Sequence, residues 1–160
     1  MALQGGHRFP VSMEDLYPDG LYAMSVEEAQ DYDEKTGRRS PAKDKLTGER
    51  VYNVTCYDRG PEVRPRDRQV TVKVSAQVQP VLPGEIAPGT GLHAVEFTGL
   101  TVTPYVSENG GRARLAYSIR ATGMHAQGKV PAASATPTGR SGGQAATGTP
   151  DGGGHEGRAA

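Results

Sequence analysis

The strongest constraint on the fold is a strict alternation of apolar and polar side chains over residues 69–81, QVTVKVSAQVQPV. Its apolar members share one parity and are Val70, Val72, Val74, Ala76 and Val78. Successive side chains of a strand point to opposite faces, so this pattern predicts a strand with one face in the core. No long stretch carries an apolar stripe at helical spacing, and we therefore expect an all-β protein.

Four further stretches show similar alternation, and they are residues 20–28, 50–58, 94–106 and 112–124. The last two flank Asn109-Gly110-Gly111, which predicts a β-hairpin because Asn and Gly tolerate the positive φ of tight turns. Pro- and Gly-rich loops separate the others. The sequence thus predicts a small five-stranded antiparallel barrel, OB-like (the oligonucleotide-binding type), or a sandwich.

The 160 residues are expected to form one domain with two appendages. We expect a flexible leader over 1–12, a single β domain over 13–125, and a disordered tail over 126–160. The tail is rich in Gly, Ala, Thr and Pro, and Val130 is its only sizeable aliphatic residue, so it has too little apolar surface to offset the entropy of ordering.

The cellular compartment is suggested by the lone cysteine, Cys56, since a chain with one thiol forms no internal disulfide and suits a reducing interior. No apolar run reaches the length of a signal peptide or membrane span. We expect a cytoplasmic protein with no membrane partner.

Catalytic and metal-binding motifs are weak in this chain. "DYDEKTG" (31–37) has Thr36 at the sixth position, where a calcium loop needs glycine, and no glutamate follows at the twelfth, so it is better explained as a solvated acidic loop. "GTGLHA" (89–94) lacks the strand and helix of a dinucleotide site, and the four histidines are scattered. Cys56 alternates in phase with Tyr52 and Val54, as a core residue would. We expect no enzyme, no cofactor and no metal.

Charge is the more informative feature, although the formal net charge is zero. Residues 14–34 carry only acidic charges, whereas bases dominate 59–73 and recur along 112–120. A neutral domain can still present one basic face. The candidate nucleic-acid-binding residues are Arg64, Arg66, Arg68, Lys73, Tyr105, Arg112, Arg114 and Arg120. They could also form the solvent-exposed face of an ordinary sheet, and the residues alone leave both interpretations open.

A family resemblance covers residues 7–125. The segments that carry it, in order, are "HRFPVSMEDLYPDGLYAM", "DKLTGERVYNVTCYD", "RQVTVKVSAQVQPVLP", "VEFTGLTVTPYV" and "RARLAYSIRATGM". Together they resemble the plasmid replication, integration and excision activators, the Pra-type regulators of integrating conjugative elements in actinomycetes.

The resemblance implies an accessory regulator that activates the replication, integration and excision functions of a mobile element. It supplies no catalytic or ligand residues. DNA, single- or double-stranded, is the expected partner, together with other replication or excision proteins of the element. The alternative is a module that binds no DNA and recruits or relieves another regulator through its acidic 14–34 face or an open strand edge.

Overall fold

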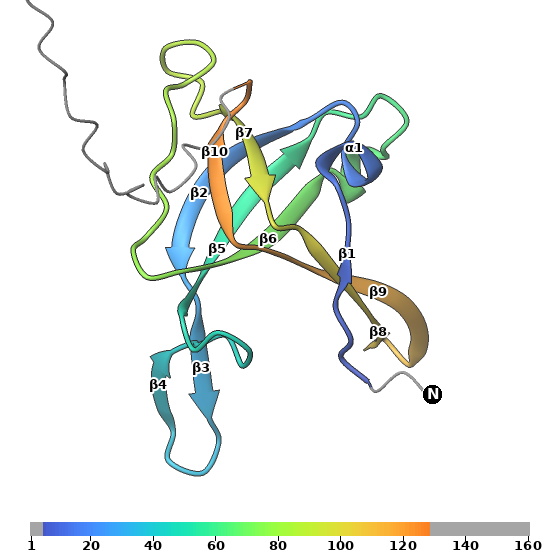
Figure 1. Cartoon of the computed structure of the whole chain (residues 1–160). Coiled ribbons are helices and arrows are strands. Elements are labelled where there is room, and N and C mark those ends of the chain that lie inside the picture. The colour runs from blue at the N-terminus through green and yellow to red at the C-terminus, as the bar shows by residue number, and fades with distance from the viewer. Residues whose placement is uncertain (1–4, 129–160) are drawn as a thin grey trace, which may run out of the picture.

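The structure is a computed structural model that describes residues 5–128. Its main element is an eight-stranded sheet (Figure 1). In spatial order the strands are β1 (Phe9–Pro10), β8 (Thr101–Asn109), β9 (Arg112–Ala121), β6 (Gln69–Ala76), β5 (Arg50–Asp58), β2 (Leu21–Glu28), β7 (His93–Thr98) and β10 (Gly123–Ala126). The remaining elements are the hairpin of β3 (Gln30–Asp33) and β4 (Arg38–Pro41), the helix α1 (Met13–Leu16) and the 3₁₀ turn η1 (Pro65–Asp67). The protein is mostly β, as the alternation predicts.

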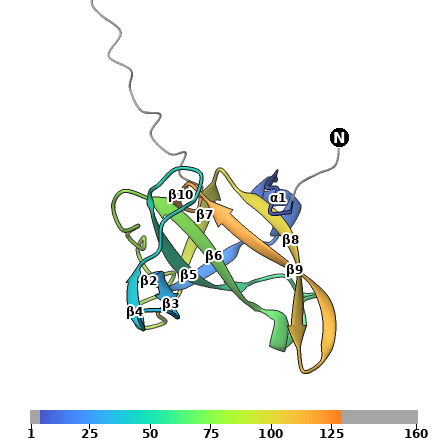
Figure 2. The same ribbon diagram turned by 90° about the horizontal axis from the view of Figure 1, so that it is seen from below.

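The sheet is strongly curled. β9 lies third in the order and β10 lies last, yet only Thr122 separates them along the chain. Likewise β7 and β8 are separated only by Gly99 and Leu100. A continuous chain can join such distant places only if the sheet bends back on itself, and β10 indeed also lies against β6. Figures 1 and 2 show this curl from two directions.

The expectation of a five-stranded antiparallel barrel is wrong in two respects. The stretches 94–106 and 112–124 are each divided into two strands, and the short β1 adds another. In addition, β6 and β9 pair in parallel, so the sheet is mixed. Of the leader expected at 1–12, residues 1–4 lie outside the described part of the chain. In the rest, β1 pairs with β8 and Val11 donates to the carbonyl of Leu100 at 3.0 Å. The tail expected at 126–160 falls, from residue 129 onward, outside the described part of the chain.

The core lies within the curl. Its fully buried side chains come from β2, β5, β6 and β7, and they are Leu21, Val54, Cys56, Val72, Val74 and Val95. The strands β5 and β6 thus use their apolar parity as the sequence predicts. β2 differs, because it buries Leu21 and Ala23 while Tyr22, Met24 and Val26 are only partly buried, and its register shifts after Ala23. Burial raises the pKa of the Cys56 thiol to about 12. The inward parity ends before Val78, which is 77% exposed beyond the end of β6.

Two hairpins extend from the body on either side of β6 (Figures 1 and 2). One is β8–β9, whose turn has Gly110 at φ 64° and Gly111 at φ 78°, as the Asn-Gly-Gly signal predicts. The other is β3–β4, which the sequence suggested only as an acidic loop. Its turn is held by Asp33, whose carboxylate accepts hydrogen bonds from the Lys35 amide and the Thr36 hydroxyl, both at 2.9 Å.

Candidate nucleic-acid interface

A hollow lies where β6 and β9 separate. The two strands pair only at three positions, from Val72 with Ile119 to Val74 with Ala121. Before these pairs β9 turns away within its hairpin with β8, while β6 begins at Gln69. The resulting wedge has a volume of about 630 Å³. Its lining includes the polar and aromatic side chains of Gln69, Thr71, Lys73, Tyr105, Tyr117 and Ser118.

Two smaller hollows adjoin the wedge. One, of about 290 Å³, shares Tyr105 and Ser118 with it and adds Arg8, Lys45, Thr103 and Arg120. The other, of about 200 Å³, shares Lys73 with the wedge and Lys45 and Arg120 with its neighbour, and adds Lys43 and Asn53 near the β3–β4 hairpin. Because they share residues, the three hollows form one depression, which we call the basic groove. Its cations are Arg8, Lys43, Lys45, Lys73 and Arg120.

A buried carboxylate holds the centre of the basic groove together. The Asp44 side chain is only 1% exposed, and Nη1 of Arg8 donates to both its oxygens at 2.9 and 3.2 Å. Nη1 of Arg120 lies 3.5 Å from Oδ2, and the Ser75 hydroxyl donates to the same oxygen at 2.8 Å. Burial opposes ionisation, but the hydrogen bonds from Arg8, Ser75 and two backbone amides outweigh it and hold the pKa of Asp44 well below its ordinary value.

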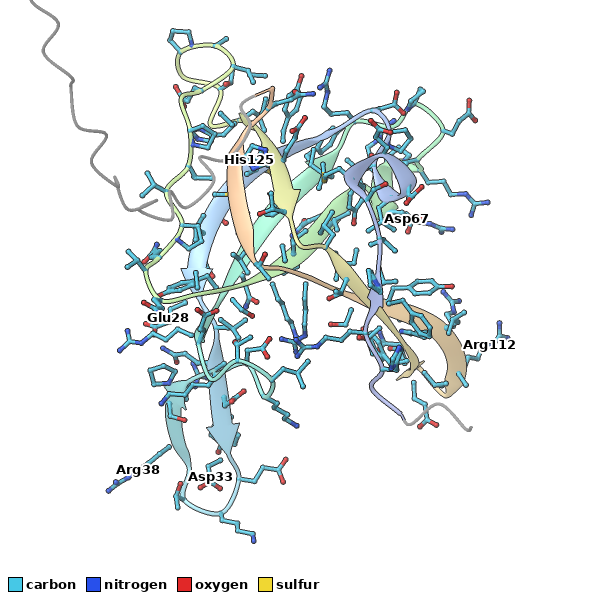
Figure 3. The ribbon with its side chains drawn as sticks, in the orientation of Figure 1. Glu28, Asp33, Arg38, Asp67, Arg112 and His125 are labelled. Carbon is cyan, nitrogen blue, oxygen red and sulfur yellow. The ribbon has the colours of Figure 1, made fainter. Side chains whose placement is uncertain are left out.

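The structure brings together three of the candidate residues named from the sequence. Lys73, Tyr105 and Arg120 all line the basic groove. Arg112 and Arg114 do not line its hollows: they are exposed near the tip of the β8–β9 hairpin, where Figure 3 labels Arg112. They keep the parity of Arg120, however, and so belong to the same face of β9.

Arg64, Arg66 and Arg68 lie apart from the groove lining, on the connection between β5 and β6. Arg68 is engaged locally, since its guanidinium stacks 5.5 Å from the Tyr57 ring centroid and donates to the Asp58 carbonyl at 3.3 Å. Arg66 lies 3.8 Å from the carboxylate of Asp67. This connection therefore offers weaker candidates than the sequence suggested.

Sequence reasoning missed four groove residues. Arg8 lies in the expected leader, and Lys43 and Lys45 lie between the strands expected at 20–28 and 50–58. Tyr117 has the parity opposite to the arginine row and enters the wedge only because β9 leaves β6. The only sequence signal for this part of the groove is weak. Lys43 and Lys45 flank Asp44, and the two lysines face the groove while the acidic residue between them is buried.

The β8–β9 hairpin also exposes an apolar face. Val106 and Leu115 are directly paired across the strands and are 66% and 63% exposed. Tyr117, paired with Pro104, is 58% exposed. Within residues 5–128, the edge of β9 that faces away from β8 has a strand partner only at its last three residues. Both faces and one edge of this hairpin are thus open to solvent.

The fold and the groove define a mostly β protein with a curled mixed sheet and a cationic, tyrosine-lined depression. Comparison with known proteins adds no relative: no family model, no curated protein and no solved structure matches the chain. In the part of the chain that the structure describes, no helix is long and apolar enough to cross a bilayer.

Proposed function

We propose that the protein binds single-stranded nucleic acid in the basic groove and thereby acts as an accessory regulator of a mobile genetic element. The observation that carries this proposal is the convergence of five cationic side chains with Tyr105 and Tyr117 in one continuous depression. Single strands are typically held by a positively charged groove that follows the backbone and by aromatic rings on which bases stack.

The charge balance of the groove favours a polyanionic ligand. Five cations line the three hollows, and the acidic residues there are Asp31 at one end and the buried Asp44 beneath. Hydroxyl and amide groups from Thr71, Thr103 and Ser118 and from Gln69 and Asn53 add neutral hydrogen-bonding capacity. Such a mixture suits phosphates and base edges together.

The tyrosines favour a single strand over a duplex. Tyr105 and Tyr117 are 49% and 58% exposed, so each ring has free surface at the wedge that both line. A ring can stack on a base only when that base has left its neighbours, as in single-stranded nucleic acid. The two hairpins lie on either side of β6 (Figure 2), and residues of both line the hollows of the groove.

The order of strand pairing supports an OB-like arrangement. β2, β5 and β6 pair consecutively and antiparallel, β9 joins β6 in parallel, and β7 returns to the side of β2. OB folds bind oligonucleotides over their second and third strands, between the loops that join strands 1 to 2 and 4 to 5. Here β5 and β6 would take those places, and the two loops would correspond to the β8–β9 hairpin and to the base of the β3–β4 hairpin at Gln30 and Asp31, while the β3–β4 turn at 33–38 lies outside the groove lining.

The regulatory role rests on the resemblance over residues 7–125 to the replication, integration and excision activators. An activator of this kind would act on DNA that is locally unpaired, as it is where replication or excision begins.

Fluorescence anisotropy of the full chain tests the proposal, with labelled single-stranded and duplex DNA at low and physiological salt. We expect the single strand to bind more tightly, with a negative salt dependence that corresponds to several phosphates. Lys73→Glu and Tyr105→Ala should each weaken binding, whereas Lys35→Glu, in the β3–β4 turn, should not. A flat titration at both salt concentrations would exclude DNA binding.

A second candidate function, a protein-interaction module, is favoured by the apolar face of the β8–β9 hairpin. Val106, Leu115 and Tyr117 leave an exposed apolar surface beside an open strand edge, the arrangement used in strand addition. This function predicts that Leu115→Glu abolishes activation in cells while DNA affinity in solution is unchanged. Loss of activation on Lys73→Glu but not on Leu115→Glu would instead favour the groove.

A further inference from the structure

Two arginines far apart in the sequence share one buried carboxylate. Arg8 comes from the segment before β1 and Arg120 from the end of β9, and both contact Asp44 through their Nη1 atoms, at 2.9 and 3.5 Å. Their side chains are 20% and 25% exposed, so each guanidinium is held against the protein with one side toward the groove.

The carboxylate leaves these guanidinium groups partly unused. Asp44 also accepts hydrogen bonds from the Ser75 hydroxyl and from the amides of Leu46 and Thr47 at 2.8 and 3.3 Å. A guanidinium has five N–H donors in a rigid plane. Since Asp44 engages Nη1 of each arginine, the Nε and Nη2 donors of both are left for another acceptor.

Both arginines line a hollow of about 290 Å³. Lys45, Thr103 and Ser118 line it together with them. Three cations over one carboxylate leave a net charge of +2, and fixed guanidinium forks match the oxygens of a phosphate. The chemistry of this hollow is that of a phosphate site.

We propose that this hollow binds one backbone phosphate of the nucleic acid, with Arg8 and Arg120 as its ligands and Asp44 as the residue that positions them. The proposal rests on the nucleic-acid-binding function proposed above and assigns a role to the N-terminal segment. Tyr105 and Ser118 line both this hollow and the adjoining wedge. A nucleotide with its phosphate on the arginines can therefore place its base in the wedge.

The segment before β1 is held in place for this role. β1 pairs with β8 at Phe9 with Val102, and Val11 donates to the Leu100 carbonyl. Arg8 is thus attached to the strand that also carries Thr103 and Tyr105. Because Arg8 has few ways to move, little entropy is lost when it binds a phosphate.

The first test measures the affinity of the full chain for an oligothymidylate of about eight nucleotides, a length within the usual range for one such site. The variants are Arg8→Ala, Arg120→Ala and both together. Because both arginines hold the same phosphate, each single variant should weaken binding, and the double variant should weaken it by less than the product of the two effects. Arg38→Ala, at the far end of the β3–β4 hairpin (Figure 3), is the matched control and should bind as the parent does.

The salt dependence adds a second reading of the same titrations. Loss of one phosphate contact on a single strand should reduce the slope of log K against log salt by about 0.7. Parent-like affinity and slope in both single variants would overturn the phosphate site while leaving the proposed function intact. The same conclusion would follow if the double variant weakened binding by the full product of the two single effects. A parent chain that binds no oligothymidylate would overturn the proposed function itself.

Asp44→Asn tests the positioning role, because charge and geometry predict opposite results. Removing a negative charge from a phosphate site should tighten binding if charge alone matters. If Asp44 holds the arginines in place, its loss should instead weaken binding, by about tenfold for one disturbed charged hydrogen bond. Tighter binding would overturn the positioning role.

Arg8→Lys also separates charge from geometry, in a variant that retains the buried carboxylate, and it applies also if Asp44→Asn does not fold. Lysine keeps the charge but lacks the guanidinium fork. We expect Arg8→Lys to bind more weakly than the parent. Parent-like affinity would mean that charge alone matters at this position, and it would overturn the positioning role of Asp44.

Discussion

Gly99 and Thr122 lie against each other at the point where both long arms of the sheet bend. Gly99 has a φ of +61°, and a Cβ atom placed on it would overlap with Oγ1 of Thr122. Thr122 in turn donates from its amide and its hydroxyl to the Thr98 carbonyl, at 2.9 and 3.2 Å. Gly99 lies between β7 and β8, and Thr122 lies between β9 and β10, so the contact ties the two bends together. Beyond these bends, β8 and β9 lie near one end of the curled sheet and β7 and β10 lie at the other.

Gly99→Ala is therefore expected to lower the free energy of unfolding by more than about 2 kcal/mol, since the positive φ alone costs 1–2 kcal/mol for a residue with a Cβ and the overlap adds to it. Thermal or denaturant unfolding measures the change. Gly110→Ala is the control: its φ is +64°, but a Cβ there meets open space, so only the conformational cost applies. Equal losses in the two variants would contradict the role of the Gly99–Thr122 contact.

Much of the sheet could be predicted from alternation, and the reasons for its failures are specific. β5 and β6 have one face in the core and one toward solvent, so parity alone locates them, whereas a register shift after Ala23 breaks the alternation of β2. The break at Gly99 leaves no such trace, because the strand pattern resumes after two residues. The parallel pairing of β6 with β9 depends on contacts between distant segments, which parity does not encode.

The site was predictable only where its residues sit on regular strands. Lys73, Tyr105 and Arg120 have polar parity on β6, β8 and β9 and could be named from the sequence. Arg8 and Asp44 are 36 residues apart and meet only after the sheet has curled, so neither stands out in the sequence. Alternation identifies exposed faces, whereas the groove arises where two strands diverge.

Asp44 predicts a specific dependence of stability on pH. Its folded-state pKa lies below the ordinary value of 3.8, so its contribution is fully present above that value and is lost as the pH falls toward the folded-state pKa. We expect the melting temperature of the parent to exceed that of Asp44→Asn at neutral pH, and the gap to narrow below about pH 4. Thermal melts of both proteins between neutral and acidic pH measure the gap. A gap that stays constant across this range would mean that Asp44 is not charged and paired as described.

Cys56 should be unreactive in the folded protein. Its side chain is fully buried between β2 and β6, and burial raises the thiol pKa to about 12, so almost no thiolate forms near neutral pH. A chromogenic thiol reagent at mildly alkaline pH should label the chain only after denaturant is added. Labelling of the folded chain at the rate of a free thiol would show that the core opens readily.

The arginines at the tip of the β8–β9 hairpin allow a test that separates function from folding. Arg112 and Arg114 are exposed, and their cross-strand partners, Asn109 and Ser107, carry no charge. The double variant Arg112→Glu, Arg114→Glu should therefore melt close to the parent temperature, because surface substitutions of this kind change stability by only about 0.5 kcal/mol. On the proposed function, we expect it to lose activation of a mobile element, because it replaces two positive charges with two negative ones on the face of β9 that also carries Arg120. A reporter assay of activation, run beside the melts and beside the Arg38→Ala control, measures both properties. A double variant that folds and still activates fully would restrict the functional surface to the basic groove.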